Sequence, residues 1–354
     1  MDIAIVTGAA GLVGSAAVEL FARSGFETVG IDNDMRRVFF GESASTSGNL
    51  RRLMDRVPGY RHHDVDVRDD AAIGRIFDTY GSDIRCVIHT AAQPSHDWAA
   101  RDPTTDFDIN ARATLVLLEQ TRTHSPAAPF VFTSTNKVYG DRPNELPLVE
   151  HDTRFELASD HPFYEHGIDE SMPVDRSTHS VFGASKLAAD VMVQEYGRYF
   201  GLNTAAFRAG CVTGSGQAGA QLHGFLSYLV KCGLEDTEYK ILGYKGKQVR
   251  DNIHAEDLVR MFLCFVEAPR PGAVYNVGGG RRAHCSLLEA VSRVEGLLGR
   301  TMRTRYVDEP RVGDHIWYVS DTRRFERDHP DWSFQHDLES ILRDILRGFR
   351  DRAL

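Results

Sequence analysis

The sequence has little of what disulfide frameworks, zinc sites or membrane spans require. Its 354 residues include five cysteines, which are scattered without a CxxC pair and therefore indicate reduced, cytoplasmic thiols. No apolar run reaches the ~18 residues of a membrane-spanning helix. The net charge is −9 and no basic tract is present, which argues against nucleic acid or an anionic membrane as a partner. The opening MDIAIVTGAAG shows no signal-peptide pattern, so we expect a cytoplasmic protein.

The first half of the chain is a regular alternation of strand and helix patterns. Hydrophobic residues make up 42% of the chain, which is enough for a full core. Strand patterns occupy residues 3–8, 27–32, 85–92, 129–135, 203–210 and 275–280, and helical patterns occupy 14–25, 106–124 and 187–201. This alternation predicts an α/β fold with a Rossmann-like, doubly wound parallel sheet.

The second half is mixed in pattern and predicts a smaller C-terminal α/β lobe for the substrate. We expect residues 1–211 and 255–280 to form the Rossmann domain, and residues 212–254 and 281–354 to form the lobe. The polar segment 141–180 is long for a loop, and we interpret its part 151–169 as a flap over the substrate. The histidines and acids of that part fit no zinc-binding spacing, so no metal site is predicted.

A glycine-rich turn follows the first strand pattern. In IVTGAAGLVGS, Gly8, Gly11 and Gly14 stand between a strand and a helix. Glycines permit a tight turn and close approach of the backbone, and the helix N-terminus offers unpaired N–H groups to a pyrophosphate. The spacing GxxGxxG in this position predicts a dinucleotide site.

An aspartate at the end of the second strand pattern indicates which dinucleotide is bound. Asp32 can accept hydrogen bonds from both adenosine ribose hydroxyls and repels a 2′-phosphate, which favours NAD over NADP. Arg36 and Arg37 follow closely, and we interpret them as a solvated basic turn. Asp66, after a third strand pattern, either meets the adenine amino group or serves as a loop aspartate or helix cap.

Seven motifs occur in order along the chain: TGAAGLVG, DVDVRD, HTAAQ, FTSTNKVYGD, FGASK, KQVRDNIHAED and RVGD. Together they resemble the extended short-chain dehydrogenase/reductases, the family of nucleotide-sugar epimerases and dehydratases. Within this family, the pattern is most similar to the branch that epimerises CDP-sugars at C2. The resemblance covers nearly the whole chain and implies an NAD enzyme that acts on a nucleotide-diphosphate sugar, with a CDP-sugar favoured and UDP or GDP as alternatives.

The resemblance also implies residue roles. Thr135 would hydrogen-bond the reacting sugar oxygen, Lys186 would hold the nicotinamide ribose, and Asn110 would hold the active-site backbone. The implied cofactor-binding residues are Gly8, Gly11, Leu12, Val13, Gly14, Asp32, Asn33, Asp66, Val67, Ala91, Ala92, Gln93, Asn110, Thr133 and Lys186. The implied substrate-binding residues are Gln93, Ser95, Thr135, Asn136, Lys137, His223, Gly224, Arg250, Arg311 and Asp314, with the two arginines on the diphosphate.

The chain departs from the family at one position. The family's YxxxK motif reads FGASK here, so Phe182 stands in place of the tyrosine that serves as the catalytic acid and base. One explanation is a relocated base, with His96, His179 and Tyr164 as candidates and His166 beside them. A second explanation is catalysis by Lys186 or water at a lower rate.

The third explanation is a protein that binds NAD and a nucleotide sugar without turning them over. Among the enzymatic readings, the leading one is an epimerase that oxidises a sugar carbon transiently, and the alternative is a 4,6-dehydratase. Those dehydratases place acidic residues after the threonine, whereas Asn136 and Lys137 follow Thr135 here. By resemblance we also expect a homodimer, formed through helices 106–124 and 187–201.

Overall fold

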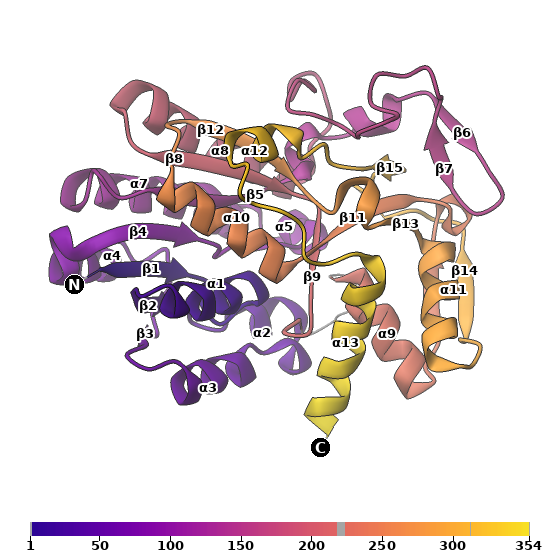
Figure 1. Cartoon of the computed structure of the whole chain (residues 1–354), viewed down its shortest axis with the longest axis horizontal. Helices are drawn as coiled ribbons and strands as arrows, with labels where there is room; N and C mark the ends of the chain where they lie inside the picture. The colour runs from indigo at the N-terminus through magenta and orange to yellow at the C-terminus, as the bar shows by residue number, and fades with distance from the viewer. Residues whose placement is uncertain (1, 218–223, 312, 354) are drawn as a thin grey trace.

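A computed structural model describes residues 2–217, 224–311 and 313–353. Its centre is a seven-stranded, all-parallel sheet in the order β12-β8-β5-β4-β1-β2-β3. Figure 1 shows these strands side by side. The strands are β1 (Ile3–Thr7), β2 (Glu27–Ile31), β3 (Arg61–His63), β4 (Ile84–His89), β5 (Phe130–Thr135), β8 (Thr204–Ala209) and β12 (Ala273–Val277). The predicted Rossmann-like α/β fold is therefore confirmed.

Helices cover both faces of this sheet. One face carries α1 (Leu12–Arg23), α3 (Ser47–Arg56) and α10 (Ala255–Glu267), and the other carries α4 (Asp70–Tyr80), α7 (Ala113–His124) and α8 (Ser180–Phe200). Successive residues of β1 point to opposite faces, so that Ala4 and Val6 join the first core cluster while Ile3 and Ile5 join the second. This arrangement explains why the strands are apolar throughout.

The predicted helix 106–124 is interrupted. It consists of α6 (Pro103–Phe107), a π-helical turn over Asp108–Arg112, and α7. A π turn shifts the register of a helix by one residue and is frequent at functional sites. Here the turn contains Asn110, which is fully buried.

The smaller lobe contains a second sheet. Its strands are β9 (Cys211–Thr213), β11 (Val249–His254), β13 (His284–Ser286) and β15 (Trp317–Tyr318), and β10 (Tyr239–Leu242) pairs with β14 (Thr304–Val307) beside it. The lobe's helices are α9 (Phe225–Glu235), α11 (Leu287–Leu298) and α13 (Leu338–Ala353). They bury a separate apolar cluster that includes Leu229, Val294 and Ile341.

One segment of the predicted lobe packs elsewhere. Phe325, in α12 (Arg323–Asp328), packs against rings of the large sheet, with its centroid 5.1 Å from that of Tyr275 and 6.0 Å from that of Phe207. Trp332 Nε1 also donates to Asp257 O of α10 at 3.3 Å. Phe325 and Trp332 thus belong to the apolar core of the large sheet, although they follow residue 280 in the sequence.

The remaining short elements lie around the two lobes. They are the helices α2 (Met35–Phe40) and α5 (His96–Arg101), the single-turn helices η1 (Glu42–Ala44), η2 (Gly81–Asp83), η4 (Asn136–Tyr139), η5 (Arg142–Glu145), η6 (Tyr244–Gly246) and η7 (Gly280–Arg282), and the hairpin of β6 (Leu148–Glu150) with β7 (Phe155–Leu157). Among the helices of the described residues, none is long and apolar enough to cross a membrane.

Candidate active site

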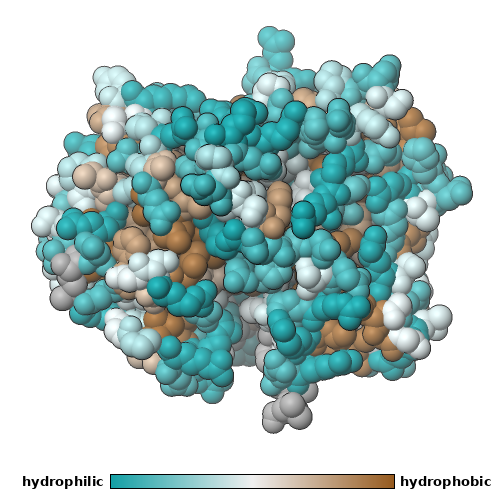
Figure 2. All heavy atoms as spheres, viewed as in Figure 1, coloured by the Kyte–Doolittle hydropathy of each residue, from teal (hydrophilic) through white to brown (hydrophobic). Residues whose placement is uncertain are grey.

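A cavity of about 1440 Å³ lies between the carboxyl ends of the sheet strands and the smaller lobe. The strand order reverses between β4 and β1, and ligands of doubly wound sheets bind at such a switch point. Figure 2 shows the surface hollowed in this region, between α3 and α13. The volume exceeds the ~300–1,000 Å³ of a typical small-molecule pocket. It is therefore large enough for two ligands side by side.

The glycine turn forms one wall of this cavity. Gly8 has a φ of +66°, and a Cβ there would lie 2.7 Å from Ala91 N. Gly14 serves helix packing, since a Cβ there would lie 2.0 Å from Gly8 O. Helix α1 begins after Gly11 without a side-chain cap or an acidic residue in its first turn. This leaves its N–H groups available to an anion, so the turn fits the pyrophosphate of a dinucleotide.

Asp32 lies at the end of β2 with its carboxylate fixed by two backbone donors. Ala10 N donates to Oδ2 at 3.0 Å and Asp34 N donates to Oδ1 at 2.8 Å. Burial raises the pKa of Asp32, and these two hydrogen bonds oppose the shift. Each carboxylate oxygen keeps a further lone pair for a ribose hydroxyl. The residue therefore fits the adenosine ribose of NAD.

The neighbouring Asp66 also lines the cavity, but its charge is already paired. Arg68 Nη2 donates to it at 2.7 Å and Asn33 Nδ2 at 3.2 Å. The hydrogen bond from Arg68 lowers the pKa of Asp66. Val67 and Asn33 line the same end. An adenine base at this position would meet an anchored carboxylate and not a mobile one.

A part of this wall was not predicted from the sequence. Asp34, at a φ of +54°, accepts from Thr46 N at 2.8 Å and thereby ties the start of α3 over the dinucleotide end. Asn49 of α3 then donates to Ala10 O at 2.9 Å and to Gly216 O at 3.2 Å, which joins both lobes. The only sequence signal was the short polar STSGN, which reads as an ordinary loop.

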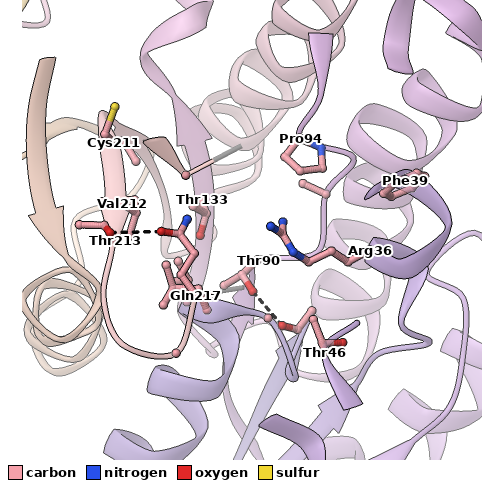
Figure 3. A pocket seen from close by; sticks show the side chains of 18 of the residues that line it. Arg36, Phe39, Thr46, Thr90, Pro94, Thr133, Cys211, Val212, Thr213 and Gln217 are labelled. Carbon is pink, nitrogen blue, oxygen red and sulfur yellow. Dashed lines mark hydrogen bonds between the residues drawn. The ribbon is translucent and has the colours of Figure 1, made fainter. Parts of the chain in front are cut away.

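Arg36 does not form the solvated turn that we predicted from the sequence. Figure 3 shows its guanidinium extending into the pocket from α2, opposite Cys211 and Thr213 of the smaller lobe. Burial lowers its pKa to about 10. Arg37 is solvent-exposed, as predicted, and lies 3.8 Å from Glu42. The difference arises because the helical turn of α2 directs adjacent side chains away from each other.

At the other end of the cavity, Thr135 and Lys186 line the wall. Thr135 ends β5 and lines the cavity together with Thr133. Lys186 is buried, its Nζ donates to Thr133 O at 2.8 Å, and it lies 4.1 Å from the centroid of the Phe132 ring. Burial lowers its pKa to about 7, against the opposing charges of Asp190 and Asp106.

Phe182 also lines the cavity, in contact with His96. The two ring centroids are 5.0 Å apart in an edge-on arrangement, and His96 Nδ1 is hydrogen-bonded to Ser180 Oγ at 2.9 Å. Burial and then the charge of Lys137 lower the pKa of His96 to about 3, so the imidazole is neutral. His96 is the first residue of α5 and not part of a loop.

Three residues that we predicted to contact the ligands lie behind the cavity wall and not on it, namely Gln93, Ser95 and Asn110. Gln93 N donates to Asn110 Oδ1 at 3.0 Å, and Asn110 Nδ2 donates back to Gln93 O at 3.1 Å. Gln93 Nε2 is taken up by Asp106 and by Ser95 O. The side chains of these three residues and of Asp106 are buried. They hold the chain after β4 rigid, with Ala91 and Ala92 facing the cavity.

One part of the cavity gathers basic residues from both lobes. Arg250 of β11 lies 3.5 Å from Asp314, and Arg311, Lys137, Asn136 and Gly224 line the same region. Burial alone would raise the pKa of Asp314, but the positive charges of Arg250, Lys137 and Arg311 lower it. His223, also predicted to bind substrate, lies outside the described residues.

Two candidates for a relocated base lie away from the cavity. His179 Nε2 pairs with Val138 O at 2.9 Å, and Tyr164 lies under the guanidinium of Arg281 at 5.4 Å. Neither lines the cavity, and His166 contacts Glu165 instead. The interpretation of 151–169 as a flap over the substrate is also wrong, because no residue of this segment lines the cavity. The apolar residues of this segment pack beside the small sheet.

A separate cluster outside the cavity brings three potential metal ligands together. Atoms of His254, Glu256 and His336 lie within 4.8 Å of one another. His254 already uses both nitrogens, since Nδ1 accepts from Glu256 N at 3.2 Å and Nε2 is bonded to Asp344 at 3.0 Å. These contacts tie α13 to α10, and we assign the cluster a structural role.

Comparison with known proteins agrees with this geometry. Residues 4–278 match the NAD dependent epimerase/dehydratase family. The CDP-paratose 2-epimerase of Salmonella typhi is 31% identical over 93% of this chain and 94% of its own length. A dTDP-glucose 4,6-dehydratase of Escherichia coli is 26% identical over 98% of this chain and 92% of its own length.

A solved structure agrees with the fold. The UDP-glucuronic acid 4-epimerase from Bacillus cereus, in complex with UDP-glucuronic acid and NAD, superposes with a TM-score of 0.80. It is 22% identical, over 99% of this chain and 100% of that chain. The match over most of the sequence and the dinucleotide turn with Asp32 lead to one conclusion about cofactor and lineage. The cofactor is NAD, and the chain belongs to the NAD dependent epimerase/dehydratase family.

Proposed function

We propose that this protein is an NAD-dependent nucleotide-sugar epimerase that oxidises a sugar carbon transiently, with C2 of a CDP-sugar favoured. One observation carries the proposal. A single cavity runs from the dinucleotide turn at Gly8, past Thr135 and Lys186, to the basic residues Arg250 and Arg311. A ligand that fills it would present a diphosphate to the arginines and its sugar to Thr135.

Bound NAD would supply hydride transfer from the sugar carbon and back to it. The residues of the chain orient and bind. Gly8 and the start of α1 would hold the pyrophosphate, Asp32 the adenosine ribose, and Lys186 the nicotinamide ribose. Thr135 would donate to the sugar oxygen as it becomes a carbonyl. Arg250 and Arg311 would hold the nucleotide end while the sugar turns over.

The 4,6-dehydratase is the competing activity, since several curated relatives carry that name. The residues after Thr135 argue against it. A dehydratase needs groups that remove and deliver protons beside the reacting carbon, and in the family these are acidic residues. Here the positions hold Asn136 and Lys137, neither of which is a carboxylic acid.

The test is a panel of CDP-, UDP- and GDP-sugars incubated with the NAD-loaded protein. An epimerase gives a product of unchanged mass whose sugar proton couplings change in the NMR spectrum. A sugar deuterated at C2 keeps its label when the same carbon is oxidised and reduced. A dehydratase gives a product lighter by one water, and this result would replace the proposal. No product with any sugar, together with retained binding, would identify a non-catalytic binding protein.

We further propose a homodimer formed through α7 and α8. Exposed apolar side chains occur on both helices, including Leu115 of α7 and Val191 and Phe200 of α8, the last of which is 50% exposed. Such side chains on neighbouring helices favour burial against a second copy. Light scattering should give twice the monomer mass, and Val191→Glu should halve it.

A further inference from the structure

The site as built so far lacks a group that can exchange a proton with the sugar. Phe182 fills the position where the family has its tyrosine, and it is 7% exposed. Its ring has no titratable atom. Among the described residues that line this part of the cavity, the nitrogen bases are His96, Lys186 and Lys137. These are the nitrogen bases that could accept the proton when the protein turns over a sugar.

His96 and Lys186 are poorly suited to this task. His96 uses Nδ1 on Ser180, and burial beside a lysine keeps its pKa at about 3, which makes it a weak base. Lys186 points at Thr133 O and the Phe132 ring, on the side of β5. This is the geometry of a residue that holds a ribose and not of one that reaches a sugar hydroxyl.

Lys137 also lines the cavity, and its amine makes one hydrogen bond. It follows Thr135 by two residues, in the helical turn η4. Its Nζ donates to Gly313 O at 2.8 Å. Gly313 in turn lies against His96, since a Cβ on Gly313 would be 2.8 Å from His96 Cε1. The residue that holds the amine thus packs against His96, and one hydrogen-bonding position of the amine is used.

Burial and the charges around Lys137 bring its pKa close to physiological pH, so that a fraction of the amine is neutral there. The titratable groups that face it are Asp314, Arg250, Arg311, Cys211, His96 and His315. Burial is the main cause that lowers the pKa of Lys137, to about 8, and the arginines add to it while Asp314 opposes it. A neutral amine has a lone pair for a hydroxyl proton, whereas an ammonium group has none.

We infer that Lys137 is the proton carrier of this site, in place of the tyrosine that Phe182 replaces. The inference rests on the proposed function. The sugar hydroxyl loses its proton to Nζ, so that the amine becomes ammonium. The electron pair of the broken O–H bond forms the carbonyl as the carbon gives up its hydride, which is the chemistry that NAD supplies. In the reverse step the ammonium returns the proton to the oxygen.

Two substitutions separate proton transfer from phosphate binding. Lys137→Arg keeps the positive charge but cannot become neutral, and Lys137→Met removes both. Both variants are expected to lose about 10²–10⁴-fold in kcat. Calorimetric titration with CDP should give an affinity for Lys137→Arg within about threefold of the parent protein, because the charge is kept. Lys245→Met is the matched control, since Lys245 is exposed, pairs with Glu150 and lies away from the cavity.

A readout independent of turnover is the lysine side-chain NMR spectrum. One resonance should be lost in Lys137→Met and should titrate below the range of an ordinary lysine. If Lys137→Arg kept its activity, or if its affinity for CDP fell by as large a factor as its kcat, the role of Lys137 would be overturned. The proposal that the protein is an epimerase would not be affected. If the parent protein turns over no sugar, the proposed function fails, and the inference fails with it.

Discussion

The imidazole of His96 packs edge-on against the ring of Phe182, with their centroids 5.0 Å apart. This contact places the Phe182 ring in the cavity wall, at the position that the family's tyrosine occupies in the motif. The phenylalanine is therefore a packed part of the wall and not a gap. In our proposal Lys137 replaces the lost hydroxyl, because Lys186 is turned toward Thr133 O and the Phe132 ring.

Restoring the tyrosine tests this view directly. If Lys137 carries the proton, Phe182→Tyr should change kcat by less than about tenfold, since general-base catalysis is already supplied. NAD content after purification should stay the same. A gain of a hundredfold or more would show that the natural wall has no working proton carrier. Phe182→Leu serves as the control for ring packing against His96.

The pH profile should follow Lys137. The reactive form is the neutral amine, so kcat/KM should rise with pH, by about tenfold per unit, and level off above the pKa. Burial sets that pKa at about 8. The rising limb should vanish in Lys137→Arg and persist in Lys245→Met. A limb that persists unchanged in Lys137→Arg would point to Lys186, whose pKa is about 7.

The choice of NAD over NADP should depend on Asp32. Asp32→Asn removes the charge that repels a 2′-phosphate and weakens the bonds to the ribose. The affinity for NAD should fall by about tenfold or more, which is about 1.4 kcal/mol, and the preference over NADP should narrow. Fluorescence titration with both cofactors measures this. Asp64→Asn, at an exposed position off the cavity, should leave both affinities unchanged.

The close packing of α1 on the first strand should be sensitive to a single methyl group. A Cβ on Gly14 would lie 2.0 Å from Gly8 O, so Gly14→Ala should lower the free energy of unfolding by at least about 1–3 kcal/mol. Gly296 of α11 has nothing within 4 Å of such a Cβ. Gly296→Ala should therefore stabilise by about 0.5–1 kcal/mol. Urea denaturation compares the two, and equal effects would contradict the packing argument.

The fold was predictable because its signals are local. Each sheet strand is a short apolar run, and burial on both faces forces this composition wherever the strand ends up in the sheet. The glycine turn at Gly8 and the aspartate at position 32 are adjacent in sequence to the strands that position them. The π turn around Asn110 was not predictable, because it depends on hydrogen bonds to Gln93 and Ser185 from distant segments.

The cavity wall was only partly predictable. Thr135, Lys186 and Arg250 were found because they belong to motifs in fixed order. Arg36 was misjudged, and Tyr164 and His179 were considered although they lie off the cavity. Sequence spacing gives no direction for a side chain on a long connection. Such residues are placed by whichever partner they find, as Tyr164 finds Arg281.

The sequence by itself determined the parallel sheet, the dinucleotide turn and the absence of a hydroxyl at Phe182, since these depend on neighbouring residues and on side-chain chemistry. Only the tertiary structure decided which bases share a corner with that ring. Lys137 is hydrogen-bonded to Gly313, which lies 176 residues further along the chain, and Gly313 packs against His96. Burial and the field of distant charges then set the proton affinity of each base, and no local pattern encodes those quantities.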